Sequence, residues 1–177
     1  LKGEDLKNAI PDKIYISLKD MRILTKVDML MLEMLANCNW ERPLYMAISV
    51  GEVSKLKFDH YFVQEGLAFR FTPFDYKKWG NVKGDNNYAI DVERLYENVM
   101  NRYKYGGLDT PGLYLDETTL RTCYYHRRLF AQLAKELIRQ GDNTRARKVL
   151  TYAEQAVPAY NVPEIYESGS FDIAKAY

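Results

Sequence analysis

The sequence predicts a mixed α+β protein, with a small sheet of three or four strands followed by a tetratricopeptide-like helical hairpin. Residues 116–158 show helical periodicity interrupted by a Gly-Asp pair, and residues 12–75 hold short apolar runs around one helical segment. A hydrophobic content of 47% is typical of a folded domain. We therefore expect a small α/β domain over residues 1–90, with an entry arm and a mobile loop, and a helical region over residues 91–177.

The first helix of the hairpin should run from about Asp116 to Arg139. Its apolar positions recur at three and four residues, and so share one face. They are Leu120, Cys123, Tyr124, Phe130, Leu133, Ala134, Leu137 and Ile138. Asp116 suits the N-cap, Gly141 suits the left-handed helix end, and Asp142 or Asn143 can cap the next helix.

The second helix should end at Pro158. One face carries Ala146, Val149, Leu150, Ala153 and Val157. Small residues at the crossing let two helix backbones approach closely, as in a tetratricopeptide repeat. A single repeat needs stacked neighbours. A helix over residues 91–103 could supply one. Ile173, Ala174 and Tyr177 have the spacing expected of a second repeat, truncated at the C-terminus.

The α/β domain should contain a right-handed βαβ unit. Residues 13–18 alternate apolar and polar positions, a helix capped by Thr25 ends near residues 37–39, and residues 44–50 are almost continuously apolar. Strand, helix and strand with short connections favour parallel pairing. A helical piece at residues 60–64 and a third strand at residues 67–71 follow.

Two irregular segments are predicted. Residues 75–88, rich in Lys, Gly and Asn, should form the mobile loop. Residues 104–112 hold three glycines and a proline, which indicates an irregular crossing from the sheet to the repeat.

Composition excludes several classes. A net charge of +1 gives no electrostatic basis for nucleic-acid binding. No apolar run approaches the roughly 18 residues of a membrane span. The start at Leu1 indicates an excised segment. Cys38 and Cys123 lie in apolar helical patterns and are predicted to be free thiols, with one disulfide as the alternative.

The residues give no catalytic constellation. His60 and His126 lack the neighbouring donors of a metal site, and we expect a surface or capping role for His60 and a partner-facing or solvated position for His126. The segment after residue 50 offers one glycine, Gly51, where a phosphate loop needs several. No cofactor is predicted, and this segment is not predicted to be an enzyme.

Two surfaces are candidate binding sites. A basic stripe runs along the first hairpin helix, through Arg121, Tyr125, Arg128, Gln132, Lys135 and Arg139. It is either a solvated helix face or a docking surface for an acidic protein or anionic lipid headgroups. The second candidate is a set of aromatic residues suited to stacking on sugar rings: Trp40, Trp79, Tyr76 and Tyr88.

Several segments resemble a bacterial family. They are Met34-Leu35-Ala36-Asn37, Asn39-Trp40-Glu41-Arg42-Pro43-Leu44-Tyr45, Tyr61-Phe62, Glu65-Gly66-Leu67-Ala68-Phe69-Arg70, Tyr103-Lys104-Tyr105-Gly106-Gly107 and Tyr114-Leu115-Asp116-Glu117. Together they resemble the soluble C-terminal region of multi-spanning membrane proteins, catalogued as a domain of unknown function and related to protein O-mannosyltransferase-like glycosyltransferases.

This resemblance implies that the parent protein holds any glycosyl-transfer site, with a lipid-linked sugar as donor, in membrane segments that this chain lacks. No catalytic residue can be carried over. The chain would be a non-catalytic module on the periplasmic face of the bacterial inner membrane, attached through its N-terminal side, that binds a protein partner or positions an acceptor polypeptide. A carbohydrate-binding module that uses the exposed Trp and Tyr residues is the alternative, and a free-standing nucleotide-dependent enzyme is a third.

Overall fold

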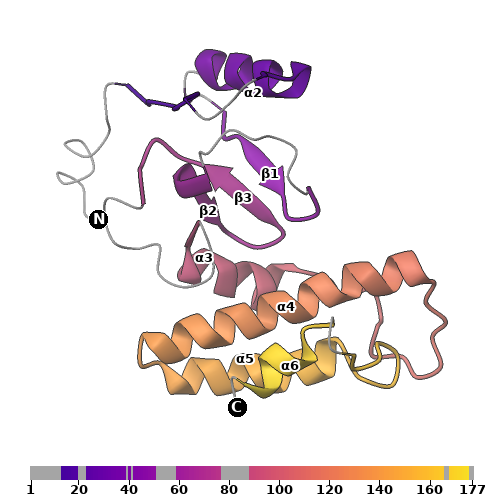
Figure 1. Ribbon diagram of the computed structural model, residues 1–177. Coiled ribbons are helices and arrows are strands. Elements are labelled where there is room, and N and C mark those ends of the chain that lie inside the picture. Colours follow the sequence, from indigo (N-terminus) through magenta and orange to yellow (C-terminus); the bar gives the residue numbers. More distant parts are fainter. Residues whose placement is uncertain are drawn as a thin grey trace. The chain divides into compact units, whose positions relative to one another are not determined.

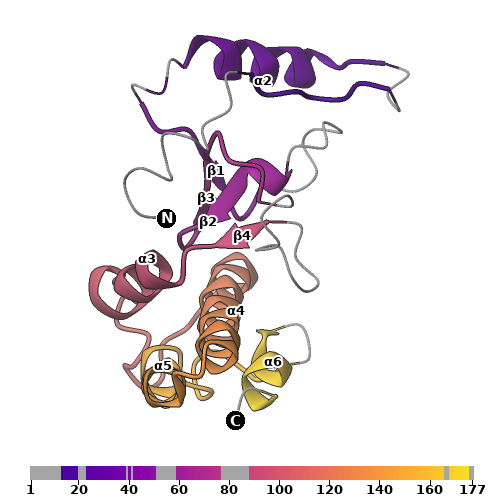
Figure 2. The ribbon, with the colours of Figure 1, turned by 90° about the vertical axis from the view of Figure 1, so that its left-hand side faces the viewer.

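The computed structural model describes most of the chain as two compact units, Leu1–Asp91 and Val92–Tyr177 (Figures 1 and 2). The described residues are 13–19, 23–38, 40, 42–50, 59–76, 88–165 and 168–175. A four-stranded sheet with helices confirms the mixed α+β class. The predicted entry arm, the segment that follows Gly51, most of the predicted mobile loop, Trp79 and Tyr177 lie outside the described residues.

The helix of the first unit, α2 (Lys26–Asn37), begins where the sequence predicts. The Thr25 hydroxyl accepts a hydrogen bond from the Asp28 backbone N–H (3.2 Å), and the Asp28 carboxylate accepts one from the Thr25 backbone N–H (2.8 Å). This reciprocal capping box satisfies two amide groups that the first turn leaves unpaired. Asp28 is 1% exposed, so the cap is also a buried structural element.

The sheet has the order β1-β3-β2-β4. Its strands are β1 (Tyr45–Ala47), β2 (Phe62–Gln64), β3 (Ala68–Phe71) and β4 (Ala89–Ile90). The β1–β3 and β2–β3 pairs are antiparallel, and only the β2–β4 pair is parallel. The short 3-10 helix η1 (Asp59–Tyr61) precedes β2.

The strand prediction is correct for residues 67–71 and wrong in three other places. Residues 13–18 form no strand, so the predicted parallel βαβ unit is absent from the described sheet. Residues 44–50 form the short edge strand β1 and not a strand buried on both faces. The helical piece at residues 60–64 is η1 followed by strand β2.

The apolar residues of these mispredicted segments still contribute to the core. Four buried aromatic side chains form its centre: Tyr61, Phe62, Phe69 and Phe71. Ile14 and Ile16 pack against this cluster, as do Met31, Leu32 and Leu35 of α2 and Met46 and Ile48 from the region of β1. The apolar character of residues 13–18 therefore reflects burial without ladder hydrogen bonds.

A polar contact reinforces the first unit. The Arg70 guanidinium on β3 lies 2.7 Å from the Glu65 carboxylate, whose side chain is only 8% exposed. The Tyr45 hydroxyl of the edge strand donates a hydrogen bond to the same carboxylate at 3.2 Å. Because Tyr45 and Arg70 are register partners, these contacts fix the β1–β3 pairing.

The second unit begins with α3 (Val92–Glu97), which continues as the π-helical turn η2 (Asn98–Arg102). Together they confirm the helix predicted over residues 91–103. The Tyr103 N–H donates to the Asn98 carbonyl at 2.8 Å, and the Tyr105 hydroxyl donates to the Val99 carbonyl at 2.6 Å. The Tyr105 hydroxyl therefore supplies a hydrogen-bond donor to a backbone carbonyl of the π-helical turn η2.

The helical hairpin follows the predicted limits closely. Helix α4 (Glu117–Arg139) is capped by the Asp116 side chain, which accepts from the Thr118 and Thr119 N–H groups. Gly141 has φ +84°, and the Asp142 carboxylate accepts from the Arg145 N–H at the start of α5 (Asn143–Ala156). Capping lowers the pKa of both Asp116 and Asp142, mainly through hydrogen bonds to Thr119 and Arg145 respectively.

The hairpin buries the predicted apolar residues. Phe130, Leu133, Ala134 and Leu137 of α4 are fully buried, and Ala146, Val149, Leu150 and Ala153 of α5 are at most 2% exposed. Helix α3 contacts α4, and its Glu93 carboxylate forms an ion pair with Arg145 at 2.8 Å. The hairpin therefore has the helical neighbour that the sequence predicts upstream.

A short helix, α6 (Ser170–Ala174), packs on α4 after the chain returns from α5. The return is held by Arg127 of α4, which is 3% exposed. Its guanidinium donates to the carbonyls of Val157, Val162 and Pro163 and to the hydroxyls of Ser168 and Ser170, at 2.7–3.2 Å. Burial lowers the pKa of Arg127, but five acceptors replace the water that the charge has lost.

Candidate binding groove

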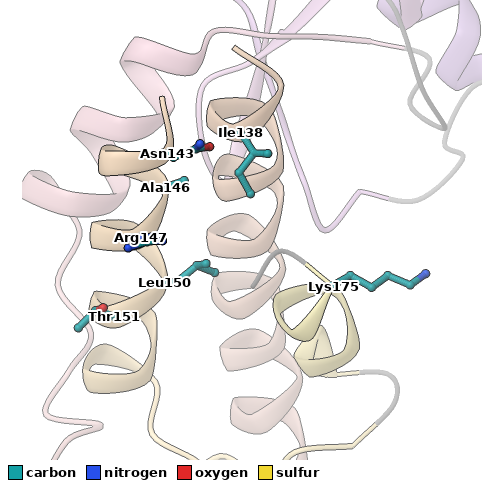
Figure 3. Close-up of a pocket in the computed structure, with 7 residues that line it drawn as sticks. All are labelled: Ile138, Asn143, Ala146, Arg147, Leu150, Thr151 and Lys175. Atoms are coloured by element: carbon teal, nitrogen blue, oxygen red, sulfur yellow. The ribbon is translucent and has the colours of Figure 1, made fainter. Parts of the chain in front are cut away.

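The hairpin of the second unit carries a groove of about 710 Å³ (Figure 3). Ile138 comes from the end of α4, and Lys175 follows α6. The other lining residues belong to α5: Asn143, Ala146, Arg147, Leu150 and Thr151. Their spacing of three and four residues places them along one side of that helix.

The base of the groove is apolar. Ala146 and Leu150 are each 2% exposed, so they form its floor, while the side chain of Ile138 is 40% exposed and remains available to a ligand. Pockets that bind small molecules or peptides commonly combine such an apolar floor with a few polar groups. The amide of Asn143 and the hydroxyl of Thr151 supply hydrogen-bonding groups here.

The charged groups of the groove are both cationic. Arg147 belongs to α5, whereas the Lys175 side chain points away from α5 and from the other labelled side chains in Figure 3. The Lys175 ammonium lies 4.3 Å from the centre of the Phe171 ring. Among the described residues no carboxylate forms an ion pair with Arg147, and none lines the groove. The groove therefore favours an anionic ligand with apolar groups.

The groove does not contain the predicted basic stripe. Arg121 is paired with Glu117 at 2.6 Å, Lys135 with Asp172 at 2.6 Å and Arg139 with Glu136 at 2.5 Å. Arg128 lies over the ring of Tyr125, with 5.9 Å from its guanidinium carbon to the ring centre. These contacts leave much of the stripe's charge compensated within the chain, and its role as a docking surface stays a prediction.

The predicted sugar-stacking residues differ in exposure and in ring packing. Trp40 is 50% exposed and stacks on Phe71, with 5.7 Å between ring centres and 6° between planes. Tyr88 is half-buried with its ring edge-on to Phe69, and Tyr76 is half-buried with its ring edge-on to Phe74. Burial raises the pKa of Tyr76. Trp40 is therefore the most exposed residue in the described part of this set.

The two histidines lie in different units and in different surroundings. His60 lies 3.9 Å from the Asp75 carboxylate in the first unit, and among the described residues no group of three or more His, Cys, Asp or Glu could hold a metal ion. The prediction that His126 faces a partner or solvent is wrong, because its ring is half-buried against Tyr103 and Tyr105. Burial lowers its pKa, and its Nδ1 atom has no hydrogen-bond partner.

Both cysteines are free, as predicted. Cys123 is buried in the hairpin, and burial raises the pKa of its thiol, so the reactive thiolate is disfavoured. Cys38 is half-buried and its thiol donates to the Leu35 carbonyl at 3.3 Å.

Comparison with known families identifies the N-terminal half of the chain. The model of the family described as TMEM260-associated domain 2 matches residues 1–93. The chain belongs to this family. TMEM260-associated domain 2 is a domain of unknown function linked to a membrane protein. No curated protein and no solved structure matches the chain.

The TMEM260-associated domain 2 match covers the first unit and ends just inside α3. The groove lies wholly outside the matched residues. Although the family is linked to a membrane protein, no helix in the described part of this chain has both the length and the apolar character to cross a bilayer.

The sequence predicts the hairpin but not the groove. The predicted basic stripe ends at Arg139, before Arg147, and Ile138 falls among the apolar positions of the first hairpin helix. A signal was present, because Asn143, Arg147, Leu150 and Thr151 recur at steps of four, three and one residues. That spacing places a polar, cationic group and an apolar side chain on one side of α5.

Proposed function

We propose that this chain is a non-catalytic binding module of a membrane protein, and that the α4–α5–α6 groove holds a segment of an acidic polypeptide. The polypeptide is either a protein partner or an acceptor. The observation that carries this proposal is the apolar floor at Ala146 and Leu150 beside the cation Arg147, with no acid among the lining residues.

The proposal extends to the parent protein. Its resemblance to protein O-mannosyltransferase-like proteins supports a glycosyltransferase-like parent with its catalytic site in membrane segments, and a periplasmic position for this module. In that arrangement the groove would retain an acceptor polypeptide close to the membrane. The family's link to a membrane protein supports the attachment but not the side or the reaction.

The test measures binding of fluorescein-labelled nine-residue peptides by anisotropy at physiological salt. A peptide of leucine and glutamate residues should bind, and a leucine–lysine peptide of the same length should not. Arg147→Glu should weaken binding at least tenfold, about 1.4 kcal/mol, because it places a carboxylate beside the anionic ligand.

Lys148→Glu is the matched control. Lys148 neighbours Arg147 on α5 and is exposed, but it does not line the groove. This reversal makes the same change in net charge, so it should leave affinity within about twofold at physiological salt, where exposed charges are screened. Equal losses in both variants would show that attraction is non-specific and would exclude the groove as the site.

A second candidate function, carbohydrate binding, is favoured by Trp40. Its indole is half-exposed and is supported from one side by Phe71, which is the arrangement of a platform for a sugar ring. Calorimetric titration with oligosaccharides should then give heat that Trp40→Ala abolishes and that Tyr114→Ala, an exposed aromatic of the second unit, leaves unchanged. Absence of heat with the native chain would exclude this function.

A further inference from the structure

The exposed hydrophobic side chains of this protein are concentrated in the first unit. Of the described residues, seventeen large hydrophobic side chains are exposed, and eleven of them lie between residues 15 and 50. Scattered exposed apolar residues are normal, whereas a concentration on one segment marks an interaction surface. This surface is separate in sequence from the groove, and of its residues only Trp40 enters the second candidate function above.

Helix α2 organises this surface. Its Met31, Leu32 and Leu35 pack on the aromatic core. Val27, Leu30 and Met34 are instead 41%, 63% and 58% exposed. Steps of three and four residues align these three side chains along the helix, and we call them the α2 stripe. Met29 (60%) and, just before the helix, Ile23 (77%) add exposed apolar area beside it.

Exposed cations lie on and around α2 in the sequence. Lys26 begins the helix, Lys19 precedes it and Arg42 follows it, and all three are exposed. Among the described residues no carboxylate pairs with Lys19 or Lys26. Asp28 is buried in the capping box, which leaves Glu33 as the exposed acid of α2. Among the described residues 13–50, the exposed charges are therefore mainly cationic, with Lys13, Lys19, Lys26 and Arg42 against Glu33.

We infer that the α2 stripe rests on the surface of a lipid bilayer that contains anionic lipids. An apolar helix face bordered by lysine is typical of helices that lie in the membrane interface, where the lysine stems extend toward the headgroups. Lysine is depleted in protein–protein interfaces, so the same lysines disfavour a partner protein. The half-exposed Trp40, two residues past the C-cap Cys38, suits the headgroup region.

Membership of the TMEM260-associated domain 2 family supports this choice of occupant. The family is linked to a membrane protein, and its match includes all of α2. A domain held near a bilayer meets lipid at high local concentration, so even a weak interfacial helix would be occupied. The stripe would then orient the first unit on the membrane.

Sedimentation of the whole chain with sucrose-loaded vesicles tests the inference. Vesicles of phosphatidylcholine with 30% phosphatidylserine should bind the chain, and pure phosphatidylcholine should bind it more weakly. The double variant Leu30→Gln/Met34→Gln should lose at least about tenfold in partition coefficient, because two apolar side chains leave the interface. Lys19→Glu/Lys26→Glu should reduce binding to the anionic vesicles only.

Tyr114→Gln is the matched control, since it also replaces an exposed apolar side chain but lies in the second unit. It should bind vesicles as the native chain does. Because all replaced side chains are exposed, the variants should keep the native circular-dichroism melting curve. If the double variant does not keep it, the single variant Leu30→Gln replaces it in the binding experiment. No binding to either vesicle would overturn the inference. So would concentration-dependent self-association that Leu30→Gln abolishes, because the stripe would then be an interface between copies.

Discussion

At the scale of single residues, His126 is the side chain whose charge state should change the stability of the second unit near neutral pH. It packs edge-on against Tyr103 and Tyr105, with 6.0 and 5.2 Å between ring centres. Burial lowers its pKa, so the folded chain binds the proton less readily than the unfolded chain, whose histidine pKa is about 6.5. Stability from this residue is therefore complete above pH about 6.5 and decreases as the pH falls below it.

The lowered pKa of His126 leads to a testable prediction. Between pH of about 7.5 and 5.5, the native chain should lose more unfolding free energy than His126→Phe, which keeps an aromatic ring at the site and cannot be protonated. Urea unfolding followed by far-ultraviolet circular dichroism at several pH values measures both. His60→Phe, in the first unit, serves as a control for general acid effects. Parallel pH profiles for the native chain and His126→Phe would contradict the prediction.

At the scale of elements, two glycines with similar backbone angles should differ in their tolerance of alanine. Gly141 (φ +84°) joins α4 to α5, and an added Cβ there meets nothing within 4 Å. Gly169 (φ +83°) precedes α6, and an added Cβ there lies 2.8 Å from Arg128 Cγ and 3.1 Å from the Arg128 backbone nitrogen. The strain of a left-handed backbone is common to both, but the steric clash occurs only at Gly169.

Gly141→Ala should therefore cost about 1 kcal/mol of unfolding free energy, and Gly169→Ala about 2–3 kcal/mol, because the latter also pushes the segment before α6 away from α4. Chemical denaturation of the two variants gives the comparison directly. Gly106→Ala, at φ +62° with open space around its Cβ, provides a second strain-only control. Equal costs for Gly141→Ala and Gly169→Ala would show that Gly169 does not pack closely on α4.

The same contrast between local and distant contacts explains which elements the sequence predicts. The α4–α5 hairpin depends on caps, a glycine turn and a period of three to four residues, all encoded within neighbouring residues, and its limits are correct to within a residue or two. Strand pairing depends on residues far apart. Residues 13–18 do alternate, and Ile14 and Ile16 do reach the core. The local sequence, however, does not determine whether another strand pairs with this segment.

At the scale of the whole molecule, the chain combines two units whose evidence for function differs in kind. The first belongs to TMEM260-associated domain 2 and carries an exposed apolar helix face. The second carries a cationic groove outside the matched residues. The net charge of +1 is a sum over both units, so it does not reveal the cationic residues of the groove or the exposed lysines around α2. Only the folded positions of these residues distinguish two candidate binding surfaces of different chemistry.

The buried guanidinium of Arg127 makes the position of α6, and with it Lys175 of the groove, depend on a residue that does not line the groove. Carbonyls and hydroxyls between positions 157 and 170 converge on that group, and Lys175 follows directly after the helix they lead into. No second cation duplicates the role in the described part of this segment. Substitution of Arg127 would therefore act at a distance. It would release the segment between residues 157 and 170 and widen the groove, although every residue that lines the groove stayed unchanged.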